Sequence, residues 1–501
     1  MTSWSGGPFA GDLNALAQHA LQALDDGNEA ESLPTLAAAA ERVRDNALLW
    51  QCTGLLYRAL DRHNEAVLAF DRAARLAPAD AKIAEGRAQI ALEAGFDAVA
   101  LFDRARALNP GNGGVHLGMA AARFAAGDSA RAIAELDSLL GSSPGWVEGH
   151  ANLARLRTMM GERDIAMVSF ERALADHPRN MALWKSLVLT LSEGEQHTAV
   201  LDVIRRGRAQ LGDIPFFDTN EAIALSEAGD VVRADALFAR ASLGEEEEVF
   251  AVHRVRHLLR TGRVGQALPL IDRWTARPDA VLIWPNAAIA WRMVDDPRWQ
   301  WLEGDERLVS VIDLGDRLPD LDQLAAALRG LHLARAQPLD QSVRGGTQTD
   351  GHLLRRCDPA IQALRAALID AVEAHIARLP PIDPAHPTLR HRRDRAVRFS
   401  GAWSVRLAGA GHHANHVHPA GWLSSALYVA LPDEAGRGGG DAGWLALGQP
   451  QEALGLDLLP QRMVEPRPGR LVLFPSWMWH GTRRFAKGER LTVAFDVAPP
   501  H

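Results

Sequence analysis

The 501-residue sequence contains little cysteine and no long apolar run. Its two cysteines, Cys52 and Cys357, are too few for a disulfide framework and favour a reducing compartment. No segment holds roughly eighteen consecutive apolar residues, and the N-terminus lacks a basic stretch followed by an apolar one. We therefore expect a cytoplasmic protein that is neither secreted nor inserted in a membrane.

An excess of positive charge is also missing. The formal net charge is -8, which argues against a general nucleic-acid binder, and we interpret the basic run 390–395 as a solvated loop. With 47% hydrophobic residues, the chain is long enough for more than one core. The sequence thus predicts a multi-domain protein with no nucleic-acid partner.

The first half of the chain repeats. One unit carries large, small and helix-ending residues at fixed spacing, namely Trp50, Gly54, Tyr57, Ala66, Phe70, Ala73 and Pro78. Small residues let two helices approach, aromatic residues fill the groove between them, and proline ends the second helix. Pro110, Pro144 and Pro178 then recur at intervals of 32, 34 and 34 residues. This pattern resembles the tetratricopeptide-repeat family.

We expect about eight such repeats over residues 13–278, after an N-terminal extension of residues 1–12. Each helix pair buries its apolar face only against its neighbours, so the pairs stack into a solenoid with a concave surface. Such a surface suits a protein or peptide partner, but it supplies no chemistry.

The composition changes near residue 279, where tryptophans interrupt the alanine-rich pattern. We expect a connecting helical segment over residues 279–340. Apolar periodicity predicts helices at 320–335 and, beyond that segment, at 358–378. From Phe399 onward, short alternating runs are bounded by glycine and proline, which is typical of antiparallel strands. The predicted strands are Trp403–Leu407, Leu423–Leu431, Trp444–Leu447, Arg470–Phe474 and Arg490–Val497.

Two histidine motifs lie in this β region, Asn415–Pro419 and Trp479–Gly481. On a strand, His416 and His418 point the same way because side chains alternate faces with period two. A third imidazole, from His480 on a neighbouring strand, closes one face of a metal. The spacing therefore predicts a mononuclear metal site.

A possible anion site follows in the last predicted strand. Arg490 and Thr492 share one of its faces, whereas Leu491 and Val493 take the other. A cation beside a hydroxyl holds a carboxylate by charge-assisted hydrogen bonds. We expect this pair beside the metal.

These motifs occur in order among several further segments: Ser342–Thr349, Trp403–Leu407, Gly421–Val429, Pro468–Pro475 and Trp477–Gly481. Together they resemble the 2-oxoglutarate- and Fe(II)-dependent oxygenases, which are related in plan to prolyl hydroxylases. The resemblance implies a double-stranded β-helix (jelly-roll) domain over residues 341–501. The expected fold class is thus α+β and multi-domain, with an all-α solenoid before a jelly-roll that has flanking helices.

The resemblance also implies roles for individual residues. His416 and His480 correspond to Fe(II) ligands, and Arg490, with Thr492 alongside, corresponds to the group that binds the far carboxylate of the cosubstrate 2-oxoglutarate. Tyr428, Gln348 and Arg406 are further candidates for contact with the cosubstrate. The implied activity is hydroxylation of a C–H bond with O2 and 2-oxoglutarate, on a peptide or protein recruited by the repeats.

The sequence departs from that family at His418, where a carboxylate is usual. Imidazole remains a competent iron ligand, although it leaves the site one unit more positive. His413 and Asp441 are spare candidates for the third ligand, and His412 and His413 are expected in supporting roles. Two alternatives stay open: a three-histidine metal enzyme that does not use 2-oxoglutarate, and a repeat scaffold with an inactive barrel.

Overall fold

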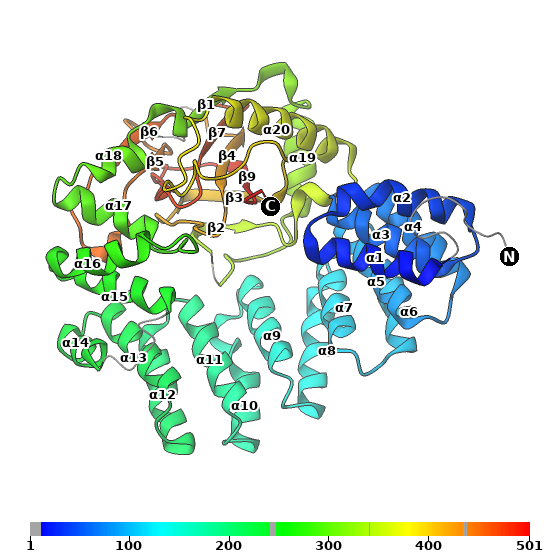
Figure 1. Ribbon diagram of the computed structural model, residues 1–501. Coiled ribbons are helices and arrows are strands. Elements are labelled where there is room, and N and C mark those ends of the chain that lie inside the picture. Colours follow the sequence, from blue (N-terminus) through cyan, green and yellow to red (C-terminus); the bar gives the residue numbers. More distant parts are fainter. Residues whose placement is uncertain (1–11, 241–246, 340, 434–435, 437, 501) are drawn as a thin grey trace. The chain divides into compact units, whose positions relative to one another are not determined.

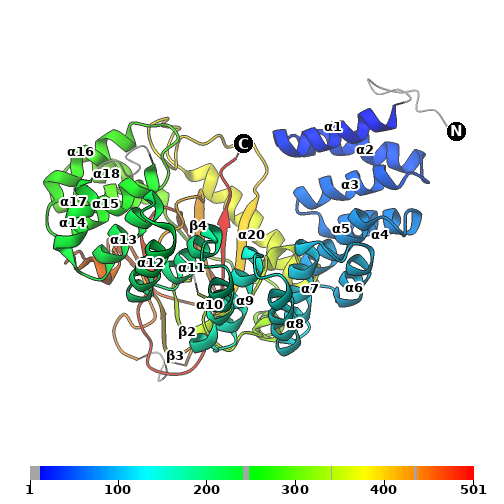
Figure 2. The ribbon, with the colours of Figure 1, turned by 90° about the horizontal axis from the view of Figure 1, so that it is seen from below.

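The computed structural model describes residues 12–240, 247–339, 341–433, 436 and 438–500. The chain divides into two compact units (Figures 1 and 2). One comprises residues 1–136 with 350–365 and 501, and the other comprises residues 137–349 with 366–500. Among the described residues, no helix is long and apolar enough to cross a membrane.

The described residues between 12 and 275 form sixteen helices, which follow one another as eight pairs. Their bounds are α1 Leu13–Asp26, α2 Glu29–Arg42, α3 Ala47–Ala59, α4 His63–Leu76, α5 Ala81–Glu93, α6 Val99–Leu108, α7 Gly113–Ala125, α8 Ser129–Ser142, α9 Val147–Met159, α10 Val168–Asp176, α11 Met181–Glu193, α12 His197–Leu211, α13 Pro215–Glu227, α14 Val231–Ala239, α15 Glu248–Arg260 and α16 Val264–Thr275. A 3₁₀ turn, η1 (Arg163–Ile165), precedes α10. We call α1–α16 the repeat region.

The first helix of several repeats begins at an equivalent cap. The side chains of Asn46, Asp80, Asn112 and Asn180 accept hydrogen bonds from backbone N–H groups at the starts of α3, α5, α7 and α11. These caps satisfy donors that lack a partner within the helix. Polar capping residues therefore recur with the period of the repeat, as the buried apolar residues do.

Gly54 shows why the repeat needs a small residue. A Cβ atom at this position would lie 2.7 Å from Cδ2 of Phe70, which is 1% exposed between helices. Only glycine leaves room for this ring, so α3 and α4 pack closely.

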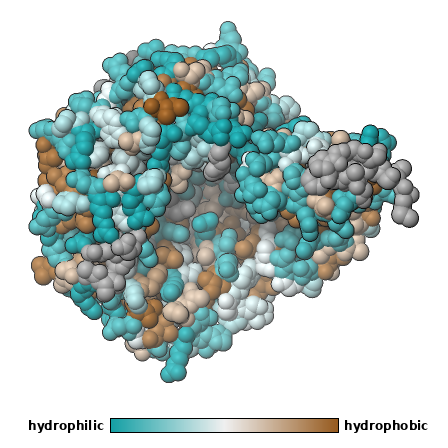
Figure 3. All heavy atoms as spheres, viewed as in Figure 1, coloured by the Kyte–Doolittle hydropathy of each residue, from teal (hydrophilic) through white to brown (hydrophobic). Residues whose placement is uncertain are grey.

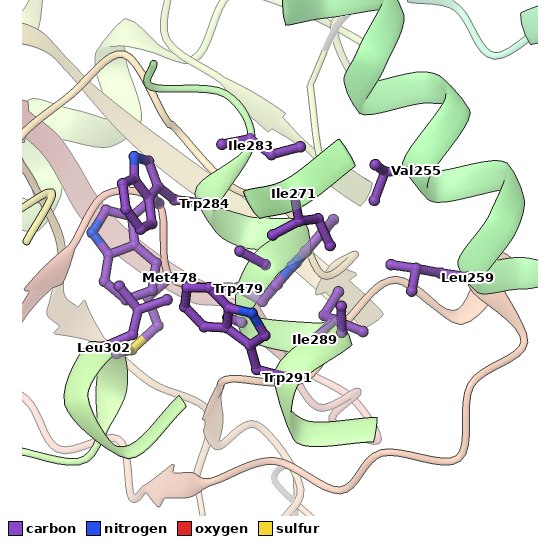
Figure 4. Packing of buried hydrophobic residues seen from close by; sticks show 14 of the residues in the cluster. Val255, Leu259, Ile271, Ile283, Trp284, Ile289, Trp291, Leu302, Met478 and Trp479 are labelled. Atoms are coloured by element: carbon purple, nitrogen blue, oxygen red, sulfur yellow. The ribbon is translucent and has the colours of Figure 1, made fainter. Parts of the chain in front are cut away.

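The end of the repeat region shares a hydrophobic core with the segment that follows it. Val255, Leu259 and Ile271 from α15 and α16 belong to one buried cluster with Trp291 and Trp479 (Figure 4). Trp479 also donates through Nε1 to the carbonyl of Pro285 at 2.9 Å. Packing is thus continuous across the boundary that the sequence predicts near residue 279.

The remaining elements build two antiparallel sheets with flanking helices. They are α17 Trp284–Met293, α18 Arg298–Glu303, η2 Glu306–Leu308, β1 Ser310–Asp313, η3 Gly315–Arg317, α19 Leu321–Leu331, β2 Val343–Gln348, η4 Leu353–Arg355, α20 Pro359–Arg378, β3 Phe399–His413, β4 Leu423–Ala430, β5 Leu445–Leu447, η5 Glu452–Leu454, β6 Arg462–Val464, β7 Arg470–Pro475, β8 His480–Thr482 and β9 Arg490–Val497. We call the two sheets and their connections the β domain.

The larger sheet has the strand order β1-β7-β4-β9-β3-β2, and the smaller has the order β6-β5-β8. β9 lies inside the larger sheet, where it pairs with both β3 and β4. Its odd-numbered residues Leu491, Val493, Phe495 and Val497 are buried at 0–1% exposure. The even-numbered residues of β9 therefore point to the opposite face of the sheet.

The observed elements confirm the α+β fold class, and each predicted strand overlaps an observed one. The predicted helices at 320–335 and 358–378 overlap α19 and α20. β1, β2 and β6 were not predicted, and His480, expected on a strand without stated bounds, lies in β8. The strand prediction for the His416 motif was wrong in detail, because His416 makes an isolated bridge to His480 and His418 lies outside any strand.

Candidate active site

Three histidines converge between the two sheets. One ring nitrogen from each of His416, His418 and His480 lies within 4.8 Å of the others. The ring centroids of His416 and His480 are 4.1 Å apart, and that of His418 is 4.9 Å from His416 and 5.3 Å from His480. Reciprocal backbone hydrogen bonds of 2.9 and 3.0 Å fix His416 against His480. The predicted trio is thus brought together without a regular strand at His418.

Each of the three rings has its Nδ1 atom occupied by an acceptor. Nδ1 of His416 lies 2.8 Å from the carbonyl of Ala414, and Nδ1 of His480 lies 2.9 Å from that of Met478. Nδ1 of His418 lies 2.6 Å from Oδ2 of Asp496. Because a carbonyl or carboxylate oxygen only accepts, each Nδ1 carries a proton, which leaves Nε2 as the ring nitrogen available to a metal.

Burial keeps two of these imidazoles neutral. It lowers the pKa of His480 to about 3 and that of His416 well below its usual value, with the neighbouring histidines adding to the effect. A neutral imidazole with a free Nε2 is the form that ligates a metal. The donor set fits Fe(II), for which imidazole is a common ligand.

A small enclosed cavity extends from the three histidines into the β domain. Its wall includes the even-numbered residues of β9, Arg490, Thr492, Ala494 and Asp496, as the alternation of a strand requires. The cavity therefore runs from the proposed metal position to Arg490.

Arg490 is a buried charge in this cavity. Its side chain is 2% exposed, its Nη1 donates to the carbonyl of Gly443 at 2.7 Å, and its Nε has no acceptor. Among the described residues, no carboxylate pairs with it, and burial lowers its pKa. An uncompensated buried cation is costly, and a carboxylate ligand in the cavity would offset that cost.

The other predicted cosubstrate contacts differ in their placement. Thr492 and Gln348 line the cavity, and the buried Oε1 of Gln348 has no hydrogen-bond partner. Tyr428 packs its ring 5.0 Å from the Arg490 guanidinium carbon and supports that side chain from behind the cavity wall. Burial raises the pKa of the Tyr428 hydroxyl, so it stays protonated.

Arg406 is not brought to the cavity. Its Nε donates to Glu489 at 2.5 Å on the exposed side of the sheet. Arg406 sits in β3 at a position of opposite parity to buried Val405, so its side chain points outward. The prediction that Arg406 contacts the cosubstrate is therefore wrong.

The spare ligand candidates also lie outside the trio. His413 is buried beside it, and its Nδ1 lies 3.0 Å from Oγ of Ser342, which is 3.2 Å from Nε2 of His416. Burial lowers the pKa of His413 to about 3. Asp441 lies 3.5 Å from Arg483, is 59% exposed, and does not belong to the cluster. His412 faces a separate groove.

His416 and His418 line a groove of about 1200 Å³, which we call the central groove, whereas His480 lines only the cavity. The floor of the central groove includes His416, His418 and Asp496, and its walls come from α9–α12 with the turns between them and from residues 337–339, 341 and 342. Figure 3 shows the surface hollowed between these helices and the β domain. The repeats therefore form part of the surface around the proposed metal position.

A second groove, of about 1260 Å³, adjoins the first and reaches α13 and α15. Both grooves include Glu195 and Arg344, whose side chains are joined at 2.8 Å. Glu195 has a φ of 55°, an uncommon backbone conformation for a residue other than glycine. The turn between α11 and α12 thus meets β2 at the junction of the two grooves.

Sequence reasoning missed Asp496 and Ser342. Side chains alternate along β9, so the sequence already places Asp496 on the same face as Arg490 and Thr492 and could have identified it. Ser342 had no such signal, because it precedes β2 in a segment without periodicity.

Two parts of the chain match family models. Residues 97–156 match "Tetratricopeptide repeat", and residues 401–496 match "Putative 2OG-Fe(II) oxygenase". The chain combines these two kinds of domain. The oxygenase match includes His416, His418, His480 and Arg490, so the converging side chains lie within the oxygenase-family domain.

Solved structures of repeat proteins are similar over parts of the chain. A tetratricopeptide repeat protein from Parabacteroides merdae is 18% identical, with 47% of this chain and 94% of that one covered and a TM-score of 0.29. Yeast Tom70 is 14% identical, with 55% and 60% covered and a TM-score of 0.37. YrrB, described as a TPR protein with an unusual peptide-binding site, is 16% identical, with 34% and 90% covered and a TM-score of 0.28. Comparison with curated proteins finds no match.

Proposed function

We propose that the protein is an Fe(II)- and 2-oxoglutarate-dependent oxygenase that hydroxylates a C–H bond of a peptide or protein segment bound in the central groove. His416, His418 and His480 would hold the iron through their Nε2 atoms. Arg490, with Thr492 and Gln348, would hold the far carboxylate of 2-oxoglutarate.

The observation that carries this proposal is the pairing of two features in one cavity. Three imidazoles lie at its mouth, and a buried guanidinium without a carboxylate among the described residues lies at its inner end. A metal site alone does not need that cation. A dicarboxylate that binds the metal at one end and Arg490 at the other accounts for both.

The groove supports a polypeptide as the substrate. Pockets for small ligands measure about 300–1000 Å³, whereas the central groove alone exceeds this range and continues into a second one. Its walls include helices and turns of α9–α12 in the repeat region, and stacked repeats of this kind present concave surfaces that bind partners.

When bound, iron supplies the oxidising chemistry: O2 and 2-oxoglutarate give succinate and carbon dioxide, and one oxygen atom enters the substrate C–H bond. The chain itself orients the reactants and limits water. Trp403 and Phe474 line the cavity with apolar surface, and Arg490 fixes one end of the cosubstrate.

The test uses the full chain loaded with Fe(II) under anaerobic conditions. After O2 is admitted, 2-oxoglutarate consumption and succinate are measured, and digests of cellular protein are searched for added oxygen atoms. We expect both signals for the parent, neither for His416→Ala or His480→Ala, and both for the control His177→Ala at an exposed position of the repeats.

Other outcomes separate the alternatives. Iron binding without 2-oxoglutarate consumption would favour a three-histidine enzyme of another kind, a reading that the imidazole of His418 supports. Absence of metal binding would indicate a scaffold with an inactive barrel. Oxidation of a small metabolite alone would overturn the polypeptide substrate and leave the oxygenase standing.

A further inference from the structure

Asp496 places a carboxylate beside the three proposed metal ligands, none of which is acidic. It is the last even-numbered residue of β9 before the strand ends, and it borders both the cavity and the central groove. Its side chain is 13% exposed and lies 2.6 Å from Nδ1 of His418. Asp496 therefore places a carboxylate behind His418, rather than directly at the proposed metal position.

Both oxygens of this carboxylate are held. Oδ2 accepts from His418, and Oδ1 accepts from Oγ of Ser424 at 2.6 Å. Oγ of Ser476 lies 3.0 Å from Oγ of Ser424 and completes a buried hydroxyl pair beneath Asp496. Strand pairing also places Ser424 directly opposite Asp496. A carboxylate with two short, charge-assisted hydrogen bonds has a fixed orientation.

His418 is fixed on its other side as well. Its ring stacks on Trp403 with 5.7 Å between centroids and 18° between planes. His418 belongs to no strand, but its backbone N–H donates to the carbonyl of Ser476 at 2.8 Å, and the two side-chain contacts then set the direction of its ring. The Nε2 atom is then aimed at the nitrogens of His416 and His480.

We propose that Asp496 is a positioning residue for the metal, which acts through His418 as a carboxylate–imidazole pair. The pair holds the proton on Nδ1, strengthens Nε2 as a donor and returns one negative charge to a site whose three ligands are neutral. This inference rests on the proposed metal site, but it does not require that 2-oxoglutarate is the cosubstrate.

The experiment is a double-mutant cycle on the full chain with metal affinity as the readout. Fe(II) is titrated anaerobically into the parent, Asp496→Asn, His418→Ala and the double variant, and the Co(II) absorption spectrum reports the ligand field. The control is Asp316→Asn, at an exposed position in η3. Near-ultraviolet circular dichroism confirms that each variant is folded.

We expect Asp496→Asn to weaken Fe(II) binding by roughly 10–100-fold, the usual range for outer-shell partners of a ligand. In the His418→Ala background the same substitution should have no further effect, because the imidazole that transmits it is gone. Asp496→Glu should recover part of the affinity. The Co(II) spectrum should change in Asp496→Asn and not in Asp316→Asn.

Three results would overturn the inference. Unchanged affinity in Asp496→Asn would show that the pair does not act on the metal, and the proposed oxygenase would still stand. Equal losses with and without His418 would make Asp496 itself a ligand. A parent chain that binds neither metal would remove this inference and the proposed function together.

A second variant covers the case in which Asp496→Asn does not fold. Ser424→Ala leaves the carboxylate in place and removes the hydrogen bond to its Oδ1. We then expect a loss of Fe(II) affinity of a fewfold with a shifted Co(II) spectrum. Parental values for both would overturn the inference.

Discussion

In the proposed function, Arg490 is the residue that binds the far carboxylate of 2-oxoglutarate. Replacing it with leucine removes the cation that faces the cavity, a contact worth about 1.5–3 kcal/mol. We expect the affinity for 2-oxoglutarate to fall by about tenfold or more while iron stays bound. Calorimetry on the iron-loaded, oxygen-free protein measures this change.

Arg406→Leu is the matched control, since Arg406 points outward to Glu489. Arg490→Lys should be intermediate, because an ammonium keeps the charge but loses the planar fork. If Arg490→Leu bound 2-oxoglutarate as tightly as the parent, the carboxylate site would lie elsewhere.

Glu303 gives a pH-dependent prediction away from the site. Burial raises its pKa to about 7, and Gln461 donates to one of its oxygens. The folded state therefore binds a proton more tightly than the unfolded chain. This stabilisation is fully present below pH 4.5 and is lost as the pH rises through 7, by on the order of 3 kcal/mol.

Glu303→Gln should consequently differ little from the parent in stability near pH 5 and exceed it near pH 8.5. Urea unfolding at several pH values tests this, with Glu306→Gln at an exposed position as the control. A stability difference that does not change with pH would contradict the assignment.

At the scale of elements, the contact between α3 and α4 depends on a missing side chain. In Gly54→Ala, the added Cβ meets Phe70 at 2.7 Å, so the helices must separate. We expect a loss of about 1–3 kcal/mol in unfolding free energy. Denaturant unfolding followed by circular dichroism measures it.

The control is Gly141→Ala in α8, where an added Cβ has no neighbour within 4 Å. Alanine favours the helix there by up to about 1 kcal/mol, so this variant should be at least as stable as the parent. Equal effects of the two substitutions would contradict a steric role for Gly54.

The strands show what the sequence could predict and what it could not. β9 alternates strictly, so its bounds and the facing of Arg490 and Thr492 followed from the residues. β2 contains Gly345 and Gly346 and shifts register between Arg344 and Gly346, which hides its alternation. β8 is only three residues long. Both strands depend on tertiary pairing, which local pattern does not encode.

The metal trio could be predicted from chemistry more than from local structure. Type and spacing identified His416, His418 and His480, although His418 lies outside any strand. Its orientation comes from Trp403 and Asp496, which are distant in sequence. The misassignment of Arg406 has a matching cause, because its partner Glu489 decides which way it points.

At the scale of the whole molecule, the larger unit couples its last repeats to the β domain through the cluster in Figure 4. Ile271 in α16 is fully buried in that cluster. We expect Ile271→Ala to cost about 2–5 kcal/mol and to lower the denaturant midpoint for loss of metal binding. The helical circular dichroism signal of the unit should fall at the same midpoint.

Val232→Ala, at a position 80% exposed in α14, is the matched control and should leave both midpoints in place. If Ile271→Ala destabilised only the helical signal, the repeats and the β domain would unfold independently.

The walls of the central groove combine inter-helix turns with residues inside α10–α12, whereas its floor combines the segment around His416 and His418 with Asp496 of the central strand β9. Turns accept substitutions and insertions at little cost in stability, but a central strand such as β9 does not. Variation in the protein's descendants, or in an engineered library, can therefore accumulate in the turns after α9 and α11 while the histidines stay fixed. In the proposed oxygenase, substrate selectivity could therefore change through the turns without any change in the residues that hold the metal.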